Sequence, residues 1–173
     1  SPTVLARQLR SDVLETLGHD RITRGPLSFD IHASDLNDGY YLHSVSYQTQ
    51  AGIRIPAYLL EPSQVPSPWA AVLVIHGCGY GKAGPAGVID DAHNSIAVRL
   101  ARVGFLVLVP DRRGFGELQP VKHYVWPSCS GDRYDARSLL EIDARESFSN
   151  DLRSLDVFDL LVAVDYLASR DDV

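Results

Sequence analysis

Two apolar runs that each end in a glycine-rich segment most constrain what this chain can fold into. The first run covers residues 70–75 and leads into the sequence His-Gly-Cys-Gly at 76–79. The second covers residues 105–109 and leads into Asp-Arg-Arg-Gly-Phe-Gly-Glu at 111–117. Residues 95–103, between the runs, have the apolar spacing of a helix. This order predicts two parallel strands joined by a crossover helix, with both glycine-rich loops at one edge of a sheet.

The flanking segments complete the plan of an α/β domain. Apolar residues at three- and four-residue steps predict a helix over residues 4–17. Residues 19–38 have no regular pattern, so we expect them to be irregular. Candidate strands at 40–48 and 53–60 are separated by a short turn and predict an antiparallel hairpin. A broad apolar face predicts a long helix over 150–169.

Composition limits the classes of function. The chain has 173 residues, is 45% hydrophobic and carries a net charge of −6, so nothing favours binding to nucleic acid or to an anionic membrane. No apolar run approaches the roughly 18–20 residues of a membrane span. The histidines are scattered and the two cysteines, Cys78 and Cys129, lack metal-ligand spacing, so we expect no metal and no cofactor. Either a reducing or an oxidising compartment is compatible with two cysteines, so the localisation stays open.

Four segments together resemble one family. Residues 40–173 are similar to the N-terminal half of an α/β-hydrolase, in the branch of acetyl xylan esterases, dienelactone hydrolases and prolyl oligopeptidases. The segments that carry the resemblance are 53–62, 76–79, 111–117 and 165–173. The resemblance implies a sheet that begins with an antiparallel hairpin and continues with parallel strands and crossover helices.

The resemblance also implies a division of the chain. We expect residues 1–39 to be an N-terminal helix and irregular lead-in, and residues 40–173 to be the N-terminal half of the hydrolase domain, with a loop excursion at about 117–147. In this branch the segment 165–173 precedes the strand that leads to the nucleophile elbow. No Gly-x-Ser-x-Gly sequence is present. We therefore expect a hydrolase sheet truncated before the elbow, with the triad residues outside this chain.

The first glycine-rich loop is, by this resemblance, an oxyanion loop. Acyl transfer builds negative charge on a carbonyl oxygen, and backbone N–H groups aimed at that oxygen stabilise it. In hydrolases with a His-Gly-x loop, the donor is the residue after the glycine, which here is Cys78. The alternative is a plain glycine turn between a strand and a helix. The residues that we expect to contact substrate are Gly77, Gly79, Tyr80, Arg112 and Trp126.

Several side chains near this loop allow two interpretations. We expect His76 to orient the loop through hydrogen bonds rather than to transfer a proton. A Cys78 thiol nucleophile paired with His76 is disfavoured, because so close a pair requires a special turn. Asp111 and Arg112 either fix their loop and line the cleft, or form plain surface ion pairs. The aromatic residues around Trp126 form either a substrate-binding wall or a loop that packs its own aromatic side chains on the sheet.

The acidic residues of the last helix are interpreted as a complement to the helix dipole. Asp151, Asp156 and Asp159 fall in what we expect to be its first turns. This interpretation gives them no catalytic role.

These expectations lead to a function. We expect the intact protein to be a serine carboxylic-ester hydrolase acting on small acyl or carbohydrate esters, to which this chain contributes the oxyanion loop but not the nucleophile. Its expected partners are the ester and the remainder of the hydrolase domain. The alternatives are a fragment of a serine peptidase of the prolyl-oligopeptidase type, and a non-catalytic hydrolase-like binding domain.

A first prediction concerns the 173-residue chain by itself. Because it has no nucleophile elbow, acid or base, the purified chain should hydrolyse p-nitrophenyl acetate no faster than a heat-treated sample. The release of p-nitrophenol, followed by absorbance, measures this. Saturable turnover that a serine reagent abolishes would contradict the prediction.

Overall fold

The computed structural model describes residues 2–19, 22–118 and 148–173, with the side chains of 148–153 left aside. The aromatic residues proposed as a substrate wall, including Trp126, lie outside these residues, as does Cys129. Most of the expected excursion at 117–147 also lies outside them. A short 3-10 helix, η3 (Gly116–Leu118), covers the point where the expected excursion begins.

The described residues form one mixed sheet of five strands with three α-helices. The strands are β1 (Phe29–Asn37), β2 (Tyr40–Gln50), β3 (Ile53–Pro62), β4 (Ala71–Leu73) and β5 (Leu106–Pro110), and their order in the sheet is β1-β2-β3-β5-β4. The helices are α1 (Pro2–Thr16), α2 (Ile96–Arg102) and α4 (Phe148–Ala168). The first three strands form an antiparallel meander, and β5 is antiparallel to β3.

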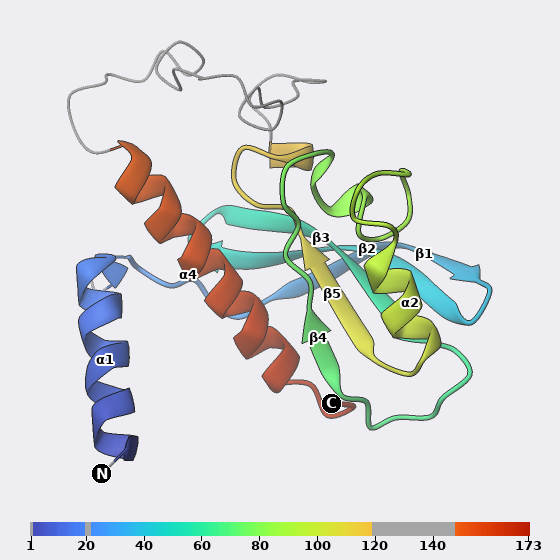
Figure 1. Cartoon of the computed structure of the whole chain (residues 1–173), viewed down its shortest axis with the longest axis horizontal. Coiled ribbons are helices and arrows are strands. Elements are labelled where there is room, and N and C mark those ends of the chain that lie inside the picture. Colours follow the sequence, from blue (N-terminus) through green and yellow to red (C-terminus); the bar gives the residue numbers. More distant parts are fainter. Residues whose placement is uncertain (1, 20–21, 119–147) are drawn as a thin grey trace.

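The expected strand–helix–strand unit is present. β4 and β5 are parallel, with Val72 opposite Val107, and α2 connects them. The hairpin of β2 and β3 is also present, although both strands run slightly further than expected. In Figure 1, β4 and β5 point the same way, and the loops that follow them meet at the upper edge of the sheet.

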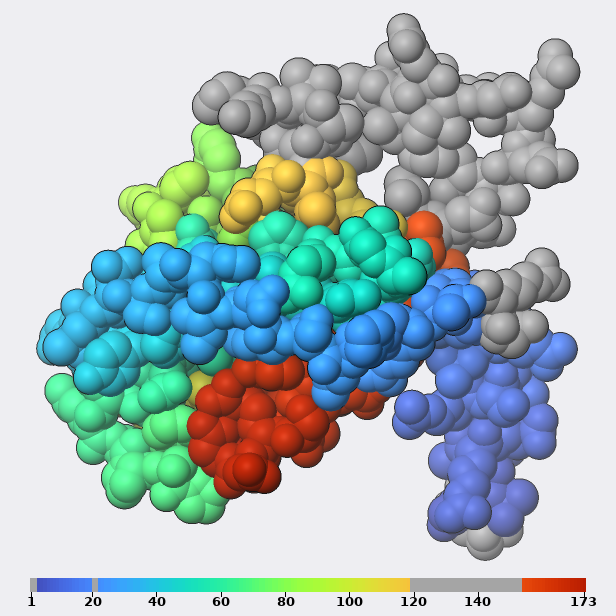
Figure 2. All heavy atoms as spheres, turned by 180° about the vertical axis from the view of Figure 1, so that it is seen from behind, coloured from blue at the N-terminus to red at the C-terminus, as the bar shows by residue number. Residues whose placement is uncertain are grey.

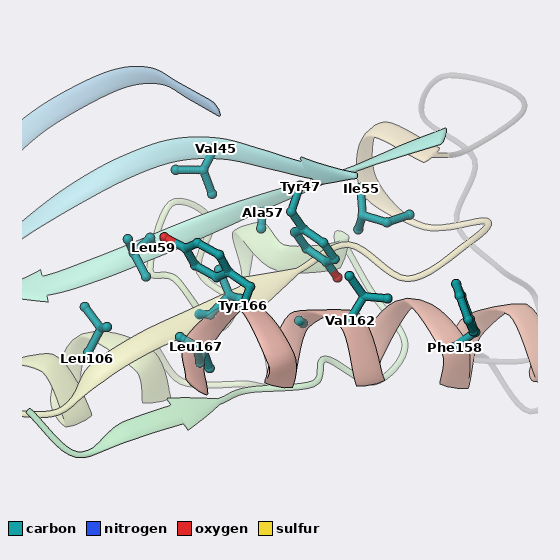
Figure 3. Close-up of a cluster of buried hydrophobic side chains, with 12 residues drawn as sticks. Val45, Tyr47, Ile55, Ala57, Leu59, Leu106, Phe158, Val162, Tyr166 and Leu167 are labelled. Carbon is teal, nitrogen blue, oxygen red and sulfur yellow. The ribbon is translucent and has the colours of Figure 1, made fainter. Parts of the chain in front are cut away.

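Helices cover both faces of the sheet, and β5 is buried between them. Leu106 and Leu108 pack with α4 on one face, whereas Val107 and Val109 pack with α2 on the other. All four side chains are fully buried. The alternation follows from the two-residue period of a strand. Figure 3 shows the α4 side, where Tyr47 and Ile55 from the sheet face Val162 of the helix.

The irregular lead-in predicted over residues 19–38 is wrong for 29–37, which form strand β1. The sequence has no apolar alternation at this strand, because the strand lies at the edge of the sheet and its side chains are largely exposed. Only Phe29 packs against the core, where its ring stacks on Tyr166. Backbone pairing with β2, rather than buried apolar side chains, therefore defines this strand.

The helix predicted over residues 4–17 is present as α1, but its apolar residues are not buried. Val4, Leu5, Leu9 and Val13 are more than half exposed. Figure 2 shows α1 projecting from the body of the molecule. The residues that follow α1 contact α4, where His19 packs edge-on against Phe158.

Candidate functional site

A buried carboxylate at the end of β5 joins the two glycine-rich loops. The Asp111 side chain has no exposed surface. Its Oδ1 accepts the Lys82 N–H at 2.8 Å, and its Oδ2 accepts the Glu117 N–H at 3.0 Å. One side chain thus binds the backbone of both loops. The alternative that Asp111 forms a plain ion pair at the surface, which the sequence left open, is therefore wrong.

The glycines around Asp111 are required by the close approach of the backbone to its carboxylate. A Cβ atom at Gly81 or at Gly116 would overlap the Asp111 side chain. Both residues also have positive φ angles, of 66° and 54°. The two loops therefore carry glycine where they wrap around a protein carboxylate.

Lys82 completes this buried network. Its Nζ donates to Asp111 Oδ2 at 2.6 Å and also contacts Glu117, and its side chain is 4% exposed. Burial alone would lower the pKa of Lys82, but the charges and hydrogen bonds of Asp111 and Glu117 outweigh burial and raise it. Lys82 therefore remains a cation at neutral pH, and its Nζ lies 5.1 Å from the centre of the Tyr58 ring.

His76 connects the same two loops through its ring nitrogens. Nδ1 lies 2.7 Å from the Gly77 carbonyl oxygen, and Nε2 accepts the Arg112 N–H at 3.0 Å. A carbonyl oxygen only accepts, so the proton is on Nδ1 and the ring is neutral. Burial lowers the pKa of His76, which agrees with this state. Both nitrogens are occupied, so His76 orients the loops, as the sequence predicts.

Two ion pairs tie the loop after β5 to α4. Arg112 Nη2 lies 2.6 Å from Asp156 Oδ2, and Arg113 Nε lies 2.6 Å from Asp159 Oδ2. The interpretation of these aspartates as a complement to the helix dipole is wrong, because α4 begins at Phe148 and both lie beyond its first two turns. They are buried and neutralise the loop arginines instead.

Residues 77–80 of the first loop are mostly exposed, whereas His76 before them and Gly81 and Lys82 after them are buried. Gly77, Cys78 and Tyr80 are exposed, and Gly79 is intermediate. Cys78 is disulfide-bonded, so its sulfur is not a thiolate nucleophile. The structure brings the Gly77 carbonyl oxygen and the Arg112 N–H to the two ring nitrogens of His76. The contacts that Cys78, Gly77, Gly79, Tyr80, Arg112 and Trp126 make with substrate remain predictions.

At residues 90–93 the sequence pattern favours a solvated helix start over a weak metal cluster, so it misses the contacts of Asp91 and His93, and it also misses the buried Lys82. His93 Nε2 accepts the Gly77 N–H at 2.9 Å, and its Nδ1 lies 2.9 Å from each carboxylate oxygen of Asp91. The sequence signal was an aspartate two residues before a histidine, next to a glycine-rich loop. For Lys82 the signal was a lone cation among glycines and small apolar residues.

The described ranges offer no metal-binding group of three or more His, Cys, Asp or Glu side chains. No helix in the described part of the chain combines the length and the apolar character that a membrane span requires.

Solved structures share this fold. A protein from Bacteroides fragilis NCTC 9343, provisionally assigned as an acetyl xylan esterase, matches with a TM-score of 0.69 and 17% identity over 96% of this chain and 44% of its own. A methylesterase matches with a TM-score of 0.68 and 20% identity over 97% of this chain and 33% of its own. An acetyl xylan esterase from Paenibacillus sp. R4 matches with a TM-score of 0.59 and 19% identity over 95% of this chain and 47% of its own.

These similarities define a class of fold. The sheet and helices of the described residues form an α/β fold that is also seen in acetyl xylan esterases. The chain spans less than half the length of each of these proteins. No family model matches the sequence.

A second prediction tests the buried network. Asp111→Asn keeps the shape of the side chain but leaves Lys82 with one carboxylate fewer, so we expect the free energy of unfolding to fall by about 3 kcal/mol. Urea denaturation measures the change. Asp38→Asn is the matched control, since it makes the same change in the exposed ion pair with Arg102 and should leave the midpoint unchanged. Equal effects of both substitutions would contradict the prediction.

A third prediction concerns pH. Burial lowers the pKa of folded His76 below its ordinary value of 6.5. Between these two pKa values the unfolded chain binds a proton that the folded protein does not, so the free energy of unfolding falls as the pH falls below 6.5. The slope from His76 approaches about 1.4 kcal/mol per pH unit at most. Urea denaturation from pH 7.5 to 5 should show a smaller slope for His76→Gln, and identical slopes would disprove the assignment.

Proposed function

We propose that this chain is part of a serine carboxylic-ester hydrolase that acts on small acyl or carbohydrate esters. The chain contributes the oxyanion loop, and the nucleophile, acid and base come from outside it. One observation carries the proposal. Hydrogen bonds of His76 and Asp111 join the first glycine-rich loop to the loop at 111–117. Both loops lie beyond the carboxyl ends of two parallel strands, in a fold shared with acetyl xylan esterases. In open α/β sheets this edge is where ligands bind.

The peptide between Gly77 and Cys78 carries the N–H group that we propose to stabilise the oxyanion. A peptide unit is planar and trans, so its carbonyl oxygen and its N–H point in opposite directions. His76 Nδ1 donates to the Gly77 oxygen at 2.7 Å, and this bond also fixes the direction of the Cys78 N–H. In the proposed reaction a serine attacks the carbonyl carbon of the ester, and the carbonyl oxygen gains negative charge. The Cys78 N–H donates a hydrogen bond to this oxygen.

The surrounding residues have supporting roles in this proposal. Gly77 and Gly79 let the backbone approach the ester closely, and the exposed Tyr80 provides an aromatic wall beside it. The Arg112 side chain is a third exposed and bound to Asp156, so in this proposal it holds its loop and keeps some surface for contact with the substrate. Trp126 is proposed as a further contact with the substrate.

The proposed substrate class draws on the solved structures with this fold. Two of those described above are named as acetyl xylan esterases and one as a methylesterase. These names share a small ester group, and acetyl xylan is a carbohydrate ester. We therefore propose small acyl esters, including those of carbohydrates, as substrates. No cofactor is required for this chemistry.

The direct test is an esterase assay on the intact protein. Turnover of p-nitrophenyl acetate and release of acetate from acetylated xylo-oligosaccharides should both be saturable and should be abolished by a serine reagent. Cleavage of prolyl peptides in place of these esters would favour the peptidase alternative. No turnover of either class by a folded protein would favour a non-catalytic binding domain.

A fourth prediction isolates the proposed donor. In the intact protein, Cys78→Pro deletes the N–H and should lower kcat by about 100-fold or more relative to Cys78→Ala. Cys78→Ala is the matched control, because it removes the same sulfur and disulfide but keeps the amide, and it should retain most of the activity. Steady-state kinetics on both variants, after circular dichroism confirms folding, measure the effect.

Two results would contradict this assignment. If Cys78→Pro and Cys78→Ala had the same kcat, the Cys78 N–H would not be the donor. If Cys78→Ala lost its activity while remaining folded, the side chain of residue 78, rather than its amide, would be required.

A further inference from the structure

The oxyanion loop is held from a second side by a pair of residues that neither the sequence motifs nor the proposed reaction uses. Asp91 and His93 lie in the connection between η2 (Gly81–Ala83) and α2. His93 Nε2 lies 2.9 Å from the Gly77 nitrogen. Asp91 lies beyond the other edge of the ring, with both oxygens 2.9 Å from His93 Nδ1.

The hydrogen bonds fix the state of the His93 ring. The Gly77 N–H can only donate, so Nε2 of His93 must be unprotonated. The ring proton is then on Nδ1 and is donated to Asp91. The Asp91 Oδ1 also accepts the His93 backbone N–H at 2.8 Å, so the aspartate fixes the histidine through both its backbone and its ring.

Asp91 is itself enclosed by the backbone of Gly79 and Gly84. Its side chain is 11% exposed, and a Cβ atom at Gly84 would overlap its carboxylate. It also lies against Gly79, where an added Cβ would be 3.3 Å from Oδ2. The backbone at Gly79 and Gly84 therefore closes around Asp91, as the backbone at Gly81 and Gly116 closes around Asp111, and the carboxylate has little room to move.

We infer that Asp91 and His93 are a positioning pair for the oxyanion loop, and this inference rests on the proposed function. Gly77 is held at both ends, because His93 accepts its N–H and His76 donates to its oxygen. A glycine has wide freedom about φ and ψ, and these two bonds restrict both rotations. The orientation of the Gly77–Cys78 peptide, and with it the direction of the proposed donor, therefore depends on His93.

The test uses three substitutions in the intact protein. His93→Leu removes the acceptor, His93→Gln keeps an acceptor oxygen, and Asp91→Asn keeps the shape but weakens the hold on Nδ1. His32→Gln is the control, since His32 lies on β1 and bonds to Ser46, away from both loops. The measurements are kcat and KM for p-nitrophenyl acetate, and hydrogen exchange of the Gly77 amide by NMR.

The expected result is a loss of kcat without a matching change in KM. A misplaced donor costs transition-state stabilisation, so His93→Leu should lower kcat by about 10- to 100-fold with KM within about twofold. His93→Gln should restore most of kcat, and Asp91→Asn should fall between them. The Gly77 amide should exchange faster in His93→Leu, whereas His32→Gln should match the wild type.

The inference fails if His93→Leu keeps the wild-type kcat, or if kcat falls with no change in Gly77 exchange. It also fails if His93→Gln, while folded, loses as much kcat as His93→Leu. If His93→Leu does not fold, Asp91→Asn decides by the same two measurements. A wild-type protein without esterase activity would refute the proposed function, and exchange of the Gly77 amide would then decide the role of the pair by itself.

Discussion

The ion pair between Asp111 and Lys82 is the interaction on which the architecture of this edge depends. Asp111 is the first residue after β5, and it is fully buried, so its negative charge needs a partner and hydrogen bonds. Lys82 supplies the charge, and backbone N–H groups from both loops supply the hydrogen bonds. The glycines at 81 and 116 follow from this arrangement, because a side chain at either position would occupy the space of the carboxylate.

The loop after β5 is fixed on three sides, which makes it a rigid support for the first loop. Asp111 holds its end, His76 holds the Arg112 backbone, and α4 holds both arginine side chains. Electrostatic stabilisation in an enzyme requires dipoles that are already oriented before charge develops. A loop fixed through buried charges meets this requirement better than one fixed through exposed contacts. The long helix therefore has two roles, covering the sheet and neutralising the loop.

Among the strands, the sequence predicted those whose side chains are buried and missed the exposed edge strand, and it also missed the side-chain pairs that join distant residues. β5 and the hairpin of β2 and β3 have clear apolar patterns, so their existence and pairing could be derived. β1 has no such pattern, because an edge strand is defined by the backbone of its neighbour. The partners of Asp156 and Asp159 are more than 40 residues away in sequence, and no local rule connects them. In the candidate site, the motif located the loop, whereas Lys82 and His93 became visible only through their contacts.

Charge and hydrogen bonding are divided between different residues at this site. Lys82 and Asp111 carry the buried charges, while His76 and His93 act as neutral connectors. In each histidine an oxygen acceptor fixes the proton on Nδ1, which leaves the Nε2 lone pair for a backbone N–H. Both nitrogens of each ring are already used in these hydrogen bonds, so we assign the general base of the proposed reaction to neither histidine. Both histidines instead fix backbone, and the backbone that they fix is the one that carries the proposed oxyanion donor.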